Sequence, residues 1–104
     1  MRVMIKVTIP VERGNAAVSD GSIGKIMQSV MGALKPEAAY FLPMGGERAA
    51  LIFCDLQDAS QIPAAIEPLF IGLNASIEMT PAMNADDLGK GLAAAEAALK
   101  QILG

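Results

Sequence analysis

The N-terminal segment of the chain alternates strictly between two kinds of side chain. One row is branched and apolar, the other mixed: the first comprises Val3, Ile5, Val7 and Ile9, and the second Arg2, Met4, Lys6 and Thr8. Because successive side chains of a strand point to opposite faces, this pattern predicts a strand with one face in a core. Later segments change between this period and one of about 3.6, which is typical of strands mixed with helices. The chain is therefore expected to form a small α+β domain.

Length and composition limit the class of protein. With 104 residues the chain is expected to form one domain over residues 1–104, and 53% hydrophobic with 18% charged residues is too apolar for disorder. No uninterrupted run of about 18 apolar residues could span a bilayer. The apolar residues near the N-terminus alternate instead of forming a signal-peptide core, so we expect a cytoplasmic protein.

Charge and residue types exclude several kinds of site. The net charge is −3, and the eight basic residues are scattered among eleven acidic ones, so no nucleic-acid partner is expected. There is one cysteine, Cys54, and no histidine, which excludes Cys/His zinc clusters and the usual general base near neutral pH. We expect no metal and no cofactor, and no catalytic residue can be assigned. Whether the protein is an enzyme stays open.

The first half of the chain predicts a loop, a helix and a hairpin after the first strand. Residues 11–20 are polar and contain glycine and asparagine, which favours a loop. An apolar stripe begins near Ser22 and Pro36 ends it, which predicts a helix between them. Apolar runs at 38–44 and 47–56 flank Gly45 and Gly46, which predicts a β-hairpin.

The second half predicts a helix, a strand and a C-terminal helix. The first of these helices is expected to start at 58–60 and reach Leu73, although Pro68 should kink it or end it early. Residues 75–80 alternate and predict a fourth strand. Asn84 with Asp87 three residues on resembles a capping box, and opens a helix with one apolar face. This face comprises Leu88, Leu92, Ala95, Leu99 and Ile102.

This order predicts a ferredoxin-like βαββαβ domain with a four-stranded antiparallel sheet and an additional C-terminal helix. Both helices would cover one face of the sheet, and the second and third strands are apolar on both sides. A monomer would expose an apolar row there, so we expect a partner sheet or helix to cover it, most economically from a second copy. We assign Leu42, Ile52 and Cys54 to this dimer face. The alternative is that the helix from Asn84 to Leu103 covers the open face within one chain.

Three segments carry a resemblance: LKPEAAYF, DASQIPAAIEP and NASIEMTPAMNADDL. With them the whole chain resembles the dimeric α+β barrel superfamily, in which two ferredoxin-like protomers pack sheet on sheet, and most of all an uncharacterised family of small bacterial proteins. The resemblance implies the fold and a homodimer. It brings no assigned catalytic residues, and the chain lacks the histidines on which several enzymes of the superfamily rely.

Three polar residues are candidates for a ligand site. Lys6 and Glu78 lie on strands expected to be neighbours, where they could pair inside a cavity or form a structural salt bridge. Tyr40, the only tyrosine, could orient a ligand oxygen or serve in packing. Cys54 is most simply a small buried hydrophobe.

Two functions remain open. In the first, a homodimer without a cofactor binds a small apolar or amphipathic molecule in a cavity by the sheet, with Lys6, Tyr40 and Glu78 as its polar groups. In the second, the protein is a non-catalytic assembly or interaction module whose sheet face contacts only protein. A membrane partner is not expected in either case.

Overall fold

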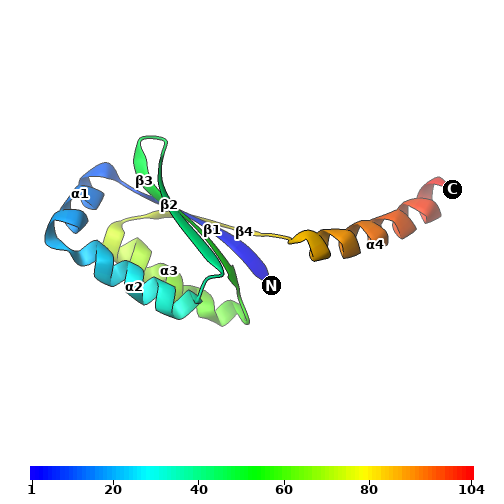
Figure 1. Ribbon diagram of the computed structural model, residues 1–104, viewed down its shortest axis with the longest axis horizontal. Helices are drawn as coiled ribbons and strands as arrows, with labels where there is room; N and C mark the ends of the chain where they lie inside the picture. Colours follow the sequence, from blue (N-terminus) through cyan, green and yellow to red (C-terminus); the bar gives the residue numbers. More distant parts are fainter.

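The computed structural model describes residues 1–104 and shows an α+β domain from which one helix projects (Figure 1). Its elements are, in order, β1 (Arg2–Ile9), α1 (Val11–Asp20), α2 (Ser22–Leu34), β2 (Ala38–Met44), β3 (Glu47–Asp55), a short 3₁₀ turn η1 (Ala59–Gln61), α3 (Ile62–Leu73), β4 (Ser76–Pro81) and α4 (Ala85–Leu103). The four strands form one antiparallel sheet in the order β2-β3-β1-β4. The helices α1, α2 and α3 lie on one side of this sheet, whereas α4 extends away from it.

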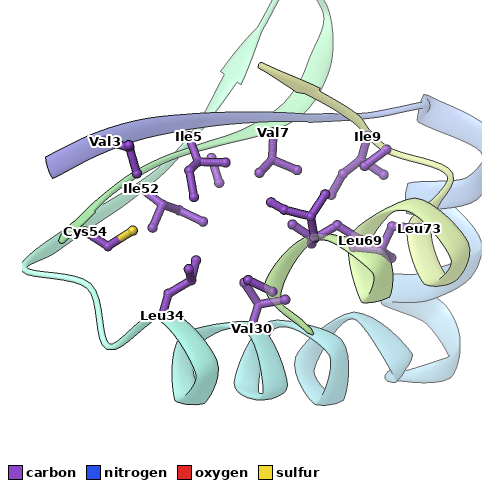
Figure 2. Close-up of a cluster of buried hydrophobic side chains, with 14 of the residues drawn as sticks. Val3, Ile5, Val7, Ile9, Val30, Leu34, Ile52, Cys54, Leu69 and Leu73 are labelled. Atoms are coloured by element: carbon purple, nitrogen blue, oxygen red, sulfur yellow. The ribbon is translucent and has the colours of Figure 1, made fainter. Parts of the chain in front are cut away.

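The alternation of β1 builds the core, as predicted from the sequence. Val3, Ile5, Val7 and Ile9 are at most 5% exposed and point toward the helices (Figure 2). Because residues opposite each other in a sheet share a face, the antiparallel register brings Ile52 beside Ile5 on this helix-covered side. Both of these side chains are fully buried. The central strands β1 and β3 thus supply the floor of the core.

The helices α2 and α3 cover the core on the side opposite the sheet. Val30 of α2 and Leu69 and Leu73 of α3 are fully buried against the sheet. The two helices approach each other so closely that a Cβ added at Gly72 would lie 2.7 Å from Cδ1 of Ile26. A glycine at this position therefore allows the two helices to pack in one layer.

The segment Val11–Asp20 was expected to be a loop, and this expectation is wrong: it forms the helix α1. Contacts distant in sequence explain the difference. The guanidinium of Arg13 donates two hydrogen bonds to the carbonyl oxygen of Gly72, from Nε at 3.0 Å and from Nη2 at 2.7 Å. Ala17 is fully buried in the core. These contacts outweigh the weak local helix propensity of the segment.

The proline in α3 does not end that helix early, because α3 continues through Pro68 to Leu73. Ile66 and Leu69 on either side of it are buried, so packing holds both halves of the helix on the sheet. The hairpin is confirmed, since Gly45 and Gly46 both have positive φ between β2 and β3.

The helix α4 forms an arm that projects from the sheet and touches it at its base, where Arg2 of β1 donates a hydrogen bond to Asp87. The capping box is confirmed, because the side chains of Asn84 and Asp87 each accept a hydrogen bond from the other's backbone N–H. Every residue of α4 is exposed, and the radius of gyration is 17.4 Å, whereas about 13 Å is typical of a compact chain of this length. The alternative in which this helix covers its own sheet is therefore wrong. No helix combines the length and hydropathy needed to cross a membrane.

Candidate functional site

The three predicted ligand residues lie in one row across the open face of the sheet. The register pairs Tyr40 of β2 with Leu51 of β3, Leu51 with Lys6 of β1, and Lys6 with Glu78 of β4. Neighbouring strands are about 4.8 Å apart, so Tyr40 and Lys6 are about 10 Å apart across Leu51. The structure thus brings all three to the face that the helices leave uncovered.

Lys6 and Glu78 lie next to each other on neighbouring strands, but their charged groups form no ion pair. Neither residue lines any of the four principal hollows of the surface, and Tyr40 borders only a shallow one beside the start of α4. In one protomer this row is therefore a flat surface and not a cavity.

The residues predicted for the dimer face divide between the two sides of the sheet. Leu42 is paired with Ala49 and Ala49 with Thr8, so Leu42 belongs to the open face. Ile52 and Cys54 are fully buried under the helices, and their assignment to the dimer face is corrected. A strand that is apolar on both sides does not reveal which row faces the helices.

The thiol of Cys54 is a structural group. Burial raises its pKa, and the nearby carboxylates of Asp55 and Glu37 add to this effect. A raised pKa keeps the sulfur protonated and weakly nucleophilic near neutral pH. Cys54 therefore acts as the small buried hydrophobe that its apolar surroundings predicted.

An apolar cavity opens on the other side of the sheet, between α1, α2 and the β2–β3 hairpin. Its volume is about 430 Å³, and nine of its eleven lining residues are hydrophobic. Val18 of α1, Met27 of α2 and Phe41 of β2 form three of its walls. Phe41 is 62% exposed, because no helix covers the edge strand β2 at this point. The cavity is thus a groove at the sheet edge that is accessible from solvent.

Arg48 is the one charged residue of this lining. It lies at the hairpin end of β3, where its Nη1 donates a hydrogen bond of 3.0 Å to Oδ1 of Asn15. A Cβ added at Gly14 would lie 2.8 Å from the same nitrogen and 3.4 Å from Cδ of Arg48. Because Gly14 has no side chain, the side chain of Arg48 can pass over α1 at this position. The hydrogen bond to Asn15 then holds the guanidinium beside the cavity.

The arrangement of the cavity suits binding. Ligand pockets typically have volumes of about 300–1,000 Å³, apolar walls and a few polar groups that fix orientation. A guanidinium has five N–H donors, and only one hydrogen bond of Arg48 is made within the protein. The remaining N–H groups can donate hydrogen bonds to an anionic or polar head group while the apolar walls surround a hydrocarbon body.

Sequence reasoning missed Arg48 and Val18 as site residues, whereas Met27 was considered for a pocket but interpreted as core. Val18 was placed in a loop, and Arg48 belongs to an ordinary strand pattern. Only the packing of three elements brings them together, so no local signal could have identified them. No group of three or more histidine, cysteine or carboxylate side chains is placed to hold a metal ion.

Three comparisons with known proteins place no relative beside this chain. No protein-family model matches the sequence, no curated protein matches it, and no solved structure matches the fold.

Proposed function

We propose that the protein binds a small apolar or amphipathic molecule in the cavity between α1, α2 and the hairpin. The observation that supports this most directly is the volume of about 430 Å³, lined almost entirely by hydrophobic residues, with Arg48 at its side. The preferred ligand would have a hydrocarbon body with an anionic or hydrogen-bonding head. Lys6, Tyr40 and Glu78, the ligand groups predicted from the sequence, take no part in this cavity.

We further propose that the domain is ferredoxin-like and acts as a homodimer. The strand order β2-β3-β1-β4 agrees with two interleaved βαβ halves to which α1 and α4 have been added. The open face carries Leu51, Phe53 and Leu42, all partly exposed, together with the largely exposed Tyr40. An apolar patch of this kind on a small domain favours coverage by a second copy, as the resemblance to dimeric α+β barrels implies.

The second candidate function is a non-catalytic assembly module. It is favoured by the flat open face, where the Lys6 and Glu78 charges are unpaired and available to a protein partner. In that case the cavity would bind nothing, and only the open face would be used.

A thermal-shift experiment with a medium-chain carboxylate distinguishes ligand binding in the cavity from the assembly module. We expect octanoate to raise Tm saturably, because a ligand at a hundredfold over its Kd adds about 2.7 kcal/mol to the free energy of unfolding. In a domain of this size that corresponds to an increase of about 10 °C or more. Octanol, which has no charge, should have a smaller effect, and Arg48→Gln should remove the difference between the two probes.

A matched pair of variants locates the binding. Val18 and Val11 are both on α1 and are 50% and 49% exposed, but only Val18 lines the cavity. Val18→Trp should narrow the cavity and reduce the Tm increase, whereas Val11→Trp should leave it unchanged. If neither octanoate nor octanol changes Tm, or if both variants behave alike, the cavity does not bind such molecules and the assembly module is favoured.

A further inference from the structure

The arm α4 presents an apolar stripe that nothing covers. Its members recur at intervals of three and four residues, so they lie on one face of the helix. The largest are Leu88, Leu92, Leu99 and Ile102, with exposures of 45%, 60%, 53% and 77%. Figure 1 shows that no other element lies beside this helix. The stripe is therefore a second unpartnered apolar surface, in addition to the open face of the sheet.

The helix combines features that favour and disfavour helix formation. The capping box and six alanines favour it, whereas Gly89 and Gly91 disfavour it, and one ion pair joins two side chains of the helix, Glu96 and Lys100. Helices of this length are marginal in water unless an amphipathic face packs against another element. The apolar stripe of α4 is such a face, and a partner surface that covered it would stabilise the helix.

The base of the arm is held in a direction that keeps it from its own sheet. The backbone N–H of Ala82 donates to the carbonyl oxygen of Arg2 at 3.0 Å, which extends the pairing of β4 with β1 beyond Pro81. Nη1 of Arg2 then donates to Oδ2 of Asp87 at 3.1 Å, and Asp87 also closes the capping box with Asn84. Only three residues connect β4 to α4. To cover its own open face, the arm would have to break these contacts and reverse its direction.

The two uncovered surfaces match each other in length. A helix of 19 residues is about 28 Å long, and β1 and β3, with eight and nine residues, span about 26 and 30 Å. The apolar centre of the open face comprises Met4, Leu51 and Phe53, which are all partly exposed. One helix laid along these strands would cover this centre, and one chain carries both surfaces.

We propose that α4 of one protomer lies on the open sheet face of a second copy, and that the exchange is reciprocal. Such an exchange buries the arm and the sheet face of both protomers in one symmetric, closed assembly. The inference rests on the homodimer part of the proposed function, and it differs from the sheet-on-sheet packing of dimeric α+β barrels because the partner's helix, and not the partner's sheet, covers the open face. It does not depend on ligand binding in the cavity, which is on the opposite side of the sheet.

The mass in solution of variants of the 104-residue chain tests the exchange. Leu92→Glu/Leu99→Glu places two charges in the stripe, and the control Ala93→Glu/Ala97→Glu places the same charges on the opposite side of α4. The wild-type protein and the control should have twice the protomer mass of 10.8 kDa in light scattering across dilution. The stripe variant should dimerise at least about ten-thousandfold more weakly, as expected from the loss of four buried leucines, two from each arm. A stripe variant that dimerises as tightly as its control would overturn the exchange.

Cross-linking between two differently labelled chains tests which surface the arm contacts. A chain with Lys6→Cys, at the centre of the open face, is mixed with a chain carrying either Ala95→Cys in the stripe or Ala97→Cys on the opposite side. Rapid disulfide formation with Ala95→Cys but not with Ala97→Cys supports the exchange. Equal rates in a protein that remains dimeric would refute the arm contact and leave the homodimer intact, whereas a monomeric wild type would overturn both. Neither result would alter the Tm increase with octanoate, so failure of the ligand proposal is recognised separately.

Discussion

Truncating two adjacent residues of β3 should have very different effects on the free energy of unfolding. Ile52 is fully buried under the helices, whereas Leu51 is partly exposed on the open face. Ile52→Ala removes three carbons from the core, which costs about 2.4 kcal/mol in transfer free energy at about 0.8 kcal/mol each. The cavity left behind raises the total to about 3–4 kcal/mol. Leu51→Ala should cost less than half of this, because its side chain keeps contact with water in the folded protomer.

The assay is urea unfolding followed by far-UV circular dichroism at two protein concentrations. For Ile52→Ala we expect a large decrease in the unfolding midpoint, of similar size at both concentrations, because the lost contacts lie within one protomer. For Leu51→Ala we expect a small decrease in dilute protein and a larger one where the dimer is populated, because mass action then adds the interface to stability. Equal costs for the two variants in dilute protein would contradict the assignment of Ile52 to the core and Leu51 to the open face.

Three further predictions concern single side chains. Arg13→Ala removes both hydrogen bonds to the Gly72 carbonyl and should lower the free energy of unfolding by about 1–3 kcal/mol in denaturant titration; an unchanged midpoint would show that these bonds do not hold α1 in place. Cys54, whose pKa burial raises, should react with a thiol reagent such as dithionitrobenzoate only after urea unfolds the protein, and rapid native labelling would contradict its place in the core. The carboxylate of Asp58 accepts hydrogen bonds from the side chain and backbone of Ser60, and these hold the pKa of Asp58 below its ordinary value. The unfolded state therefore takes up this proton first. The contribution of Asp58 to the free energy of unfolding is lost as the pH falls from about 4 through the lowered pKa. In Tm measurements against pH, Asp58→Asn should weaken this acid-dependent decrease, and an identical profile would refute the role of the carboxylate.

Local patterns in the sequence were sufficient for most of the elements. The alternation of β1, the two glycines of the hairpin and the Asn84–Asp87 capping box each act over a few residues, and the structure confirms all three. The helix α1 depends instead on Arg13 reaching Gly72, almost sixty positions along the chain. A contact at that distance leaves no periodic signal within the helix itself.

The sequence also does not show which face of a strand is buried when both of its faces are apolar. Moving the assignment by one residue exchanges Ile52 for Leu51, and composition does not distinguish them because either could be in the core. The register with Ile5 of β1 decides the matter once the sheet is formed. The same limit explains the candidate ligand residues: Tyr40, Lys6 and Glu78 do lie in one row, but that row is on the face without a cavity.

The proposed binding site is tested most directly by mapping octanoate on the protein with two-dimensional NMR. During a titration, chemical-shift changes should saturate and cluster at the cavity residues Val18, Met27 and Arg48. The chemical shifts of Lys6 and Glu78, in the row on the open face, should not change. Saturable changes confined to that row would move the ligand site to the open sheet face, and the absence of saturable changes anywhere would contradict binding of such molecules altogether.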